Sequence, residues 1–433
     1  MTPSTNDPAL AAPATALPFT FGGFTVPAGC RRIFITAELE PSGGDPRIQP
    51  TGFPDLGPVL YADPVEKHGL ICLIESEASM ANRLEEVCLD NKYEGTLRSE
   101  LAGLPYIKLT ADGTPGGTFV TASTIDGHRF ASEYIMGGHI IQAGAELTAI
   151  QSMNAAASTT DAAPAPATKS AKVKQKTAGG KPEFVRFVQS FMGMTTKDRC
   201  PAANVPRMFR LAMEYDPLAL LHGFQISVKD KLTFVGLRSP RAITASILGL
   251  NCQRIIVPGV RLDPIGTGDA GQAIFQKQRI SAKKIEARFS IDVGLLASMH
   301  LGSTPAQGVE RLQLLLRIAL CKIGWFLTAL SSGLRLRTDC DLRVVTGGVH
   351  YWTDRMGEDG TGTAFDFAAI TASATGVAPL ITTSGLDAAH SPFPLKHVAK
   401  AKKEKEDKSS EEGSGPDGDE DEAGTPSDEE TAD

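Results

Sequence analysis

The stretch GLICLIESEASMANRLEEVC, residues 69–88, decides the fold class because its hydrophobic period changes partway along. Its first six residues form a continuous apolar run of the length of a buried strand. After that run Met80, Leu84 and Val87 recur at positions i, i+4 and i+7, which predicts a helix with one apolar stripe. Ser76 is placed to act as the N-cap of this helix. A strand that leads directly into an amphipathic helix indicates a fold that mixes both elements.

The polar residues of this predicted helix raise a question of function. Ser79, Asn82, Arg83 and Glu86 share the other face, where plain Lys and Glu would solvate the helix equally well. One interpretation is a solvated face on which Arg83 pairs with Glu86 or Glu77. The other is a polar strip that binds a phosphate chain or a neighbouring subunit. The stretch alone leaves both interpretations open.

Patterns elsewhere in the chain predict an α+β protein. RRIFITAEL (31–39), KKIEARFSIDVGLL (283–296) and LRLRTDCDLRVV (334–345) alternate apolar and polar residues, which is typical of half-buried strands in an antiparallel sheet. PAQGVERLQLLLRIALCKIGWFLTALSSG (305–333) predicts one helix of roughly 25 residues with a long buried stripe. Because strands and helices do not alternate regularly, we expect an α+β fold rather than a doubly wound sheet.

Three segments in the second half of the chain give further local predictions. ALLHGFQISV (219–228) and KLTFVGL (231–237) have the composition of strands. RSPRAITASILGLN (238–251) predicts a helix with Pro240 near its first turn. We therefore expect a strand-to-helix junction close to residue 238.

The arginines of two stretches are candidate phosphate contacts. Arg238 and Arg241 would lie beside the predicted helix N-terminus, where free N–H groups and two guanidiniums could hold a phosphate. The alternative is that both arginines cap acidic neighbours. Arg335 and Arg337 line one face of the strand predicted at 334–345, where two aspartates of the same face would pair with them. That strand has no aromatic residue for base stacking.

Composition divides the chain into three parts. Residues 1–30 are rich in Pro, Ala, Thr and Gly and predict a flexible N-terminus. Residues 31–395 predict a single elaborated domain. Within it, residues 154–181 are of low complexity and lack aromatic side chains, so we expect a disordered insertion. Residues 396–433 change from basic to acidic and predict a disordered acidic tail.

Charge is distributed unevenly along the chain. The 433 residues carry a net charge of −7, yet residues 169–289 hold 21 Lys and Arg against 8 Asp and Glu. All 11 charged residues from Glu411 onward are acidic. A basic segment of this size attracts polyanions such as nucleic acid. The alternative is a flexible basic loop that the protein's own tail neutralises.

Cysteine usage and the N-terminus favour a cytoplasmic protein. The seven cysteines are scattered without a CxxC pair, which is typical of reduced thiols. MTPSTNDPALAAPATALPF has neither a basic segment nor a continuous apolar segment, so no signal peptide is expected. Arg311, Arg317 and Lys322 interrupt the longest apolar helix, and we therefore expect no membrane span and no membrane partner.

No catalytic or metal-binding motif stands out from the sequence. GTGDAG (266–271) matches GxGxxG, but a prolyl loop precedes it and no suitable acidic residue follows. The eight histidines form no HxH or HExxH pair, so no metal site is expected. His128 and Arg129 in DGHRFAS form the most notable pair, although a capped helix start would explain them without function. We expect a protein without enzymatic activity and without a cofactor.

Six stretches resemble, in this order, the RAMP backbone protein of type I-G (formerly I-U) CRISPR effector complexes of the Cascade class: RIQPTGFPDLGPVLY, ESEASMANRLEEVC, GHRFASEYI, LLHGFQIS, GLRSPRAITA and SGLRLRTDCDL. The resemblance covers roughly residues 30–385. It implies a ferredoxin-like (RRM-like) palm with large insertions, with Gly69–Ile74 as the first palm strand and residues 76–90 as the first palm helix. It also implies several copies stacked along a guide RNA that pairs with target DNA, and a separate helicase-nuclease that cuts.

The resemblance further implies which residues contact RNA. In backbone proteins of this superfamily the first palm helix lies near the guide, and a thumb-like element is expected beside the Gly-rich loop. The candidates in this sequence are Ser79, Asn82, Arg83, His128, Arg129, Arg238, Arg241, Lys283 and Lys284, and the strand pattern adds Arg335 and Arg337.

The expected function is non-catalytic binding of guide RNA (crRNA). Arg and Lys would neutralise guide phosphates in a largely sequence-independent, salt-sensitive way, leaving base identity to Watson–Crick pairing. The expected partners are guide RNA, target DNA, copies of the chain, other Cascade subunits and a helicase-nuclease. One alternative is a metal-dependent endonuclease that cuts target RNA with Asp126, Asp339 or Asp341. The other is a structural scaffold that assembles without nucleic acid.

Overall fold

The computed structural model describes most of the chain between residues 18 and 397. The described residues are 18–48, 50, 52–53, 57–65, 67–114, 116–140, 183–194, 200, 202–226, 237–255, 279–331, 341–357 and 362–397. Contacts group Met1–Val398 into one unit and Ala399–Asp433 into another. The insertion predicted at 154–181, the acidic part of the tail and the GTGDAG stretch lie outside the described residues, so the predictions on them stay predictions.

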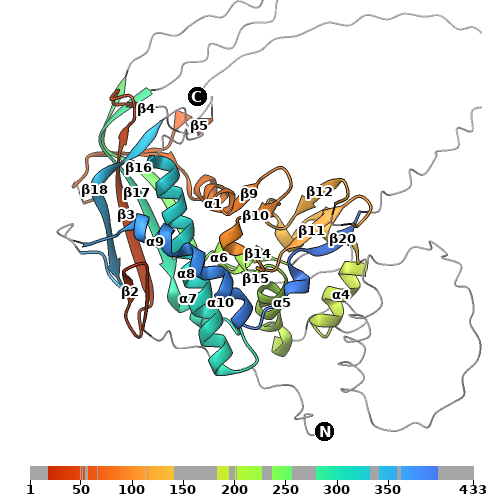
Figure 1. The fold of residues 1–433 in the computed structure, drawn as a ribbon. Helices are drawn as coiled ribbons and strands as arrows, with labels where there is room; N and C mark the ends of the chain where they lie inside the picture. The colour runs from red at the N-terminus through yellow and green to blue at the C-terminus, as the bar shows by residue number, and fades with distance from the viewer. Residues whose placement is uncertain are drawn as a thin grey trace, which may run out of the picture. The chain divides into compact units, whose positions relative to one another are not determined.

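One large antiparallel sheet forms the centre of the first unit (Figure 1). Its strands, in spatial order, are β19 (Thr363–Ala364), β18 (Leu342–Thr353), β3 (Arg32–Pro41), β17 (Arg279–Asp292), β16 (Ile243–Ile255), β8 (Leu70–Glu75) and β7 (Leu60–Ala62), and β4 (Arg47–Ile48) adds to β17. The sheet and the helices below confirm the predicted α+β class.

The alternating patterns of the sequence set the inner face of this sheet. On β3 Ile33, Ile35, Ala37 and Leu39 are all buried, as their period-2 spacing predicts. In-register partners on β17, from Ile285 to Ile291, bury the same face. The residues between them on both strands are mostly polar and lie on the opposite face of the sheet.

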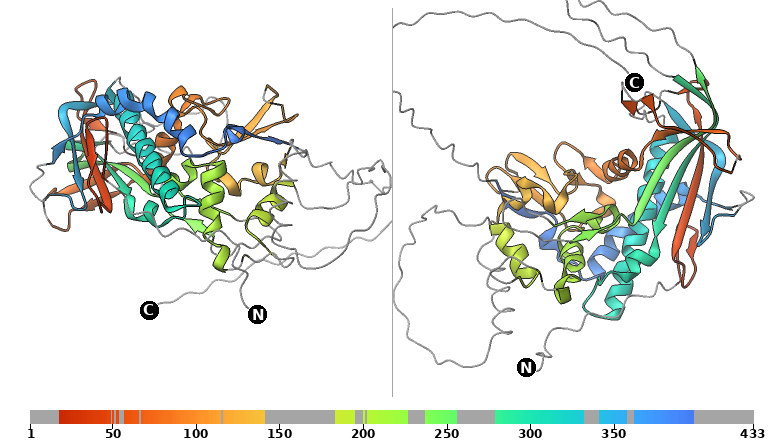
Figure 2. Two further views of the ribbon diagram at one scale, coloured as in Figure 1. Left: turned by 60° about the horizontal axis from the view of Figure 1, so that its bottom comes forward. Right: turned by 180° about the vertical axis from the view of Figure 1, so that it is seen from behind.

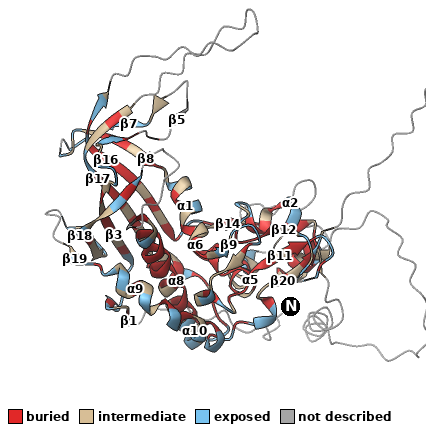
Figure 3. Cartoon of the chain, turned by 45° about the horizontal axis from the view of Figure 1, so that its top comes forward, coloured by how far each residue is buried: buried red, intermediate tan, exposed pale blue. Residues whose placement is uncertain are grey.

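The long helix α8 (Pro305–Ser331) covers the inner face, close to the predicted range of 305–333. Figure 2 shows α8 and its neighbouring helices on one side of the sheet in both views, and Figure 3 shows α8 as the most deeply buried helix. Its neighbours are α7 (Val293–Ser298), α9 (Phe367–Ser373) and α10 (Val377–Thr383). A helix that is apolar on nearly all sides is expected at the centre of a large core.

By length and composition α8 could cross a membrane, yet 78% of its apolar segment is buried inside the protein. Its charged residues also have partners within the chain. Arg311 is buried and donates to the carbonyl oxygens of Leu301, Ser384 and Gly385 at 2.8–3.1 Å and to the Glu214 carboxylate. These contacts are those of a core helix that joins distant segments of one protein.

Smaller elements extend the fold away from the central sheet. A second sheet has the order β12 (Phe119–Ala122), β11 (Ile107–Thr110), β20 (Phe393–Lys396) and β13 (His139–Ile140), with β11 and β20 parallel. The helices of this region are α1 (Glu77–Glu86), α2 (Glu133–Met136), α4 (Glu183–Phe191), α5 (Arg207–Tyr215) and α6 (Leu218–His222). Two-stranded pairs are β5 (Gly52–Phe53) with β6 (Gly57–Pro58), β9 (Leu89–Asn91) with β10 (Thr96–Leu97), and β14 (Phe224–Gln225) with β15 (Arg238–Ser239).

Two local predictions in the second half are wrong. The segment 238–251 is not a helix, because Ile243, Ala245 and Ile247 alternate inward and extend as β16 along the centre of the sheet. Conversely, Leu218–His222 is helix α6 rather than a strand, since all five of its residues are buried against surrounding elements. In both places tertiary packing overrides the local composition.

The predicted limits of flexibility are also wrong at both ends. The stretch FTFGGFTV forms the hairpin of β1 (Phe19–Phe21) and β2 (Phe24–Val26), so residues 18–30 are part of the folded unit. All four strand-end side chains are buried, and both turn glycines have positive φ, as a tight hairpin requires. Lys396, placed in the tail by the sequence prediction, is the last residue of β20.

Candidate nucleic-acid interface and the buried charge network beneath it

Helix α1 is held in place by its predicted cap and apolar stripe. The Ser76 hydroxyl accepts a hydrogen bond from the Ser79 amide at 3.2 Å, which confirms the predicted N-cap. Met80 and Leu84 are fully buried, and the helix contacts both β16 and α8. One face of α1 is therefore fixed in the core, and its polar face remains at the surface.

The polar face of α1 matches the first of the two interpretations considered for it. Arg83 Nη1 lies 3.4 Å from the Glu86 carboxylate, and the Arg83 side chain is only 22% exposed. Lys92 also lies 3.3 Å from Glu86. Asn82 is exposed and Ser79 is half-buried. Arg83 is thus part of a surface ion-pair network, and Asn82 is the exposed one of the two uncharged candidates on this helix.

Arg129, a predicted RNA contact, is instead buried and fully engaged inside the protein. Its Nη1 donates to Asp216 Oδ2 at 2.7 Å and to the Ser123 carbonyl oxygen at 3.2 Å, and its Nη2 donates to Glu85. Burial disfavours the charged form, but Asp216 and Glu85 outweigh it and raise the pKa of Arg129. The side chain is 3% exposed, so it cannot reach a phosphate in this structure.

A second buried pair extends this network toward α8. Lys322 is fully buried and its Nζ lies 2.7 Å from His222 Nε2 and 3.3 Å from the Leu84 carbonyl oxygen. Burial, and then the positive charges of Lys322, Arg129 and Arg241, lower the pKa of His222 well below its ordinary value. The ring is therefore neutral: Nε2 accepts from the ammonium, and Nδ1 carries the proton and faces Glu85 Oε1 at 3.9 Å.

This buried network brings together four of the six sequence stretches that suggested a family. Glu85 comes from ESEASMANRLEEVC, Arg129 from GHRFASEYI and His222 from LLHGFQIS. The next residue, Gly223, has φ +77°, and a Cβ there would lie 2.9–3.1 Å from the backbone of Ser239 and Arg241 in GLRSPRAITA. The stretches therefore meet in space although Glu85 and Arg241 are 156 residues apart in sequence. Of the five network residues the sequence singled out only Arg129 and missed Glu85, Asp216, His222 and Lys322, because nothing local marks a polar side chain as buried.

Next to this network, the exposed side chains of Arg238 and Arg241 form a basic corner at the surface. Both arginines are exposed, and no ion pair joins either to a carboxylate in the described part of the chain. They flank Pro240 in the turn between β15 and β16, so the helix N-terminus expected beside them is absent and β16 takes its place. Their guanidiniums are available for a phosphate without loss of an existing salt bridge.

The predicted pair Lys283 and Lys284 lies far from this corner. Both are exposed on β17, near the other end of the β16–β17 hairpin, where Arg254 is also exposed. The hairpin spans 13 residues of β16, which is roughly 40 Å at the usual rise per strand residue. Lys284 is paired with Glu286 at 3.0 Å and Glu38 at 3.7 Å. The structure thus divides the predicted basic residues between two ends of one hairpin.

The remaining predicted residues do not form a single site. His128 is exposed and lies 3.8 Å from Asp126, whose carboxylate accepts a hydrogen bond from the His128 amide in a tight turn. Arg335, Arg337 and Asp339 lie outside the described residues. The described residues contain no group of three or more His, Cys, Asp or Glu side chains placed to hold a metal ion.

Comparison with known proteins identifies one related family. The model of the family described as CRISPR-associated protein GSU0053 matches residues 33–254, from the start of β3 to the end of β16. The matched segment contains Glu85, Arg129, Asp216 and His222, four of the five residues of the buried network. No curated protein sequence gives a significant match.

Replacement of Arg129 tests the role of the network in stability. Arg129→Met leaves the Asp216 and Glu85 carboxylates buried without their counter-ion, and we expect a loss of about 3–5 kcal/mol in the free energy of unfolding. Urea unfolding followed by circular dichroism measures this loss. The matched variant Arg238→Met removes an exposed arginine and should change stability by no more than about 0.5 kcal/mol. Equal effects of the two variants would contradict the assignment.

The lowered pKa of His222 predicts a pH dependence. In the unfolded chain His222 titrates near 6.5, whereas in the folded protein it stays neutral. Its contribution to stability is complete above pH 6.5 and falls below that pH by up to about 1.4 kcal/mol per pH unit. His222→Gln keeps an acceptor for Lys322 without a titrating ring, and its melting temperature should fall less between pH 7.5 and 5.5 than that of the wild type. His128→Gln, at an exposed position, should retain the wild-type slope.

Proposed function

Because the chain belongs to the family of CRISPR-associated protein GSU0053 and so has a role in CRISPR defence, we propose that it is the backbone subunit of a type I-G effector complex. In this proposal several copies bind along one guide RNA and present it for pairing with target DNA. Other Cascade subunits and a separate helicase-nuclease complete the complex. The subunit itself binds and positions nucleic acid and performs no bond cleavage.

The observation that carries this proposal is the exposed basic corner fixed by a buried network. Arg238 and Arg241 have no carboxylate partners among the described residues, and the turn that carries them packs on Gly223, next to His222 of the network. Two guanidiniums on a packed turn suit phosphate binding, because their backbone is already in place when the phosphate arrives. Such contacts hold any sequence, as a guide-binding backbone requires.

The order of the long strands supports a ferredoxin-like palm. The spatial order β18-β3-β17-β16 is 4-1-3-2 when these four strands are numbered along the chain, and every neighbouring pair is antiparallel. Helix α1 lies on the connection from β3 to β16, and α8 on the connection from β17 to β18. This order matches the β-α-β-β-α-β arrangement of that fold and supports the proposal. In the proposed palm the first strand is β3, and Gly69–Ile74, expected in that place from the resemblance, lies beside β16 as an additional strand.

The proposed mechanism is electrostatic. Arg238 and Arg241 at one end of the β16–β17 hairpin, and Lys283 with Arg254 at the other, offer exposed cations separated by roughly 40 Å. Each cation that meets a phosphate releases a condensed counter-ion, which makes binding tight at low salt and weak at high salt. Arg83 contributes less, because its guanidinium is already paired with Glu86.

A double variant tests the basic corner directly. Arg238→Ala with Arg241→Ala should weaken binding of single-stranded RNA and reduce the slope of log K against log salt by about 1.4, or 0.7 per lost phosphate contact. The loss should be the same for guide and random RNA, measured by fluorescence anisotropy between 50 and 300 mM salt. The control replaces Arg47 and Arg343, two exposed arginines already paired with Asp45 and Glu40. Equal slopes in the two variants would contradict the proposal.

Co-purification tests the functional class. The protein, expressed with a CRISPR array and its neighbouring genes, should elute at moderate salt with RNA that carries repeat sequence, seen in the absorbance ratio at 260 and 280 nm and by sequencing. Nuclease treatment should then dissociate its oligomers. Oligomers that persist without nucleic acid would instead support the scaffold alternative.

A further inference from the structure

The outer face of the central sheet carries a group of aromatic rings at one end. Phe34 on β3 and Trp352 on β18 are in-register partners, and both side chains are partly exposed. The His350 ring lies 6.4 Å from the Trp352 indole, measured between ring centroids. No helix in the described part of the chain lies on this face (Figures 1 and 2). The Trp352 and His350 side chains pack beside Gly362 and remain partly exposed, so this group of rings lies outside the core beneath α8.

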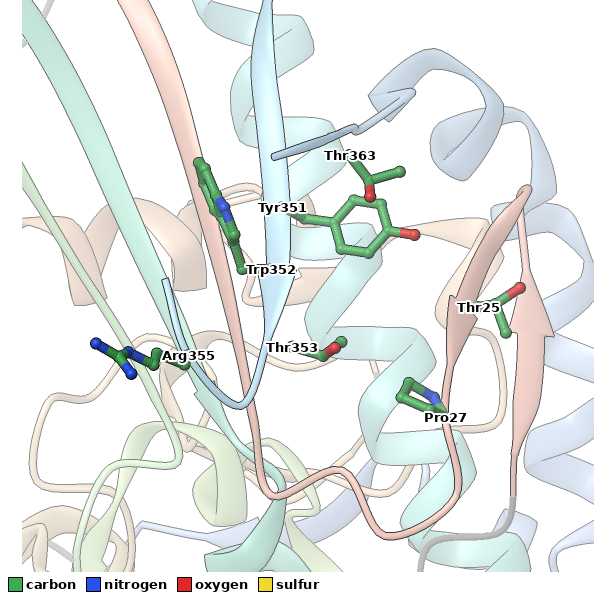
Figure 4. Close-up of a pocket in the computed structure, with 7 residues that line it drawn as sticks. All are labelled: Thr25, Pro27, Tyr351, Trp352, Thr353, Arg355 and Thr363. Carbon is green, nitrogen blue, oxygen red and sulfur yellow. The ribbon is translucent and has the colours of Figure 1, made fainter. Parts of the chain in front are cut away.

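The same end of the sheet is rich in arginine. Arg31, Arg32 and Arg355 lie within a few residues of the aromatic strands, against the two carboxylates of Asp292 and Asp354. Arg32 pairs with Asp292, while one carboxylate oxygen of Asp354 accepts hydrogen bonds from the backbone amides of Arg31 and Arg32. Figure 4 shows Arg355 on the same side of β18 as Trp352, with Tyr351 on the other side. A guanidinium therefore lies on the same side of β18 as the Trp352 ring.

Packing fixes the orientation of the Trp352 ring. Gly362 lies so close that a Cβ at this position would be 2.6 Å from the indole. Backbone pairing of β18 with β3 holds the strand from Val349 to Thr353. A ring that is held in place before a ligand arrives loses little conformational entropy when a base stacks on it.

From these rings and charges we propose that the corner of Phe34, Trp352 and Arg355 is a second binding site, which takes the bases of single-stranded nucleic acid. Stacking on aromatic side chains accepts any base, and nearby guanidiniums hold the backbone. The site lies on the sheet face opposite α1 and α8. It does not depend on the proposed guide-binding corner of Arg238 and Arg241.

The chain offers an internal reporter for this site, because it has only two tryptophans. Trp325 is 4% exposed in the core, with the Arg98 guanidinium 4.8 Å from its ring centroid. Trp325→Phe keeps that stacking and leaves Trp352 as the sole tryptophan. Titration of this full-length variant with (dT)12 and (U)12 should quench its fluorescence to a saturating level. Quenching by both oligonucleotides would indicate a general single-strand site, and quenching by one would show that the site selects between the DNA and the RNA strand.

Substitutions at Trp352 then separate stacking from folding. Trp352→Leu should weaken binding of labelled (dT)12 about tenfold, whereas Trp352→Phe should largely restore it, because one stacked base is worth on the order of 1–3 kcal/mol. Equal melting temperatures of the two variants confirm that the sheet is intact. No quenching, or equal affinities of the Leu and Phe variants, would overturn the proposal. Loss of self-association without any change in oligonucleotide binding would also overturn it and assign the corner to a protein partner.

A second comparison keeps this proposal distinct from the first. In the Trp325→Phe background, Arg238→Ala with Arg241→Ala should leave the quenching amplitude unchanged. Trp352→Leu should still co-purify with repeat-bearing RNA if the guide-binding proposal is right. If RNA is missing from wild type and variant alike while the quenching persists, the guide-binding proposal fails and the stacking site stands.

Discussion

The contact of Arg129 with Asp216 and Glu85 is the interaction on which the arrangement of helices depends. Three chain segments that are far apart in sequence meet at one guanidinium, which has almost no access to water. Charges buried in this way carry a large desolvation cost, which is offset only when each charge has a partner. The network meets this condition for Arg129, which two carboxylates face, whereas Lys322 contacts the neutral His222 ring and the Leu84 carbonyl oxygen. Any displacement of α1 or α6 would separate these charges, so their positions are tightly constrained.

This constraint explains how a surface turn between two strands acquires a fixed shape. Gly223 follows His222 directly and lies against the backbone that carries Arg238 and Arg241, with no room for a side chain. The Ala242 amide donates to the Leu221 carbonyl oxygen at 2.9 Å and closes the same junction. The buried network thus fixes the backbone of the turn that carries the two exposed arginines. A phosphate at the corner would meet groups whose placement was determined by folding.

Sequence periodicity predicted the strands that bury one face and the longest helix. The alternation in 31–39 and 283–296 predicted the inner face of β3 and β17, because one buried face determines that pattern. The long apolar stretch 305–333 predicted α8, which is buried on nearly all sides. The helix predicted at 238–251 is strand β16 from Ile243 onward, and its period of two is masked because Ala and Leu are also good helix formers. The hairpin FTFGGFTV was overlooked within a Pro-rich terminus, although its paired glycines and alternating Phe residues are a hairpin signal.

The sequence identified the stretches that form the candidate site, but not the role of each residue in it. Arg129 was predicted to contact RNA and lies in one of the stretches that meet at the network. Its side chain is instead buried against Asp216, 87 residues later in the chain. Arg83 and Arg238 look alike in sequence, yet Arg83 has a carboxylate one turn away on its own helix, whereas no ion pair joins Arg238 to a carboxylate among the described residues. No local pattern reveals that Phe34 and Trp352 are neighbours. More than 300 residues separate them in sequence, and the pairing of β3 with β18 makes them cross-strand partners. Local pattern therefore identifies which residues could act, and the long-range pairing of strands and charges decides which of them face the solvent.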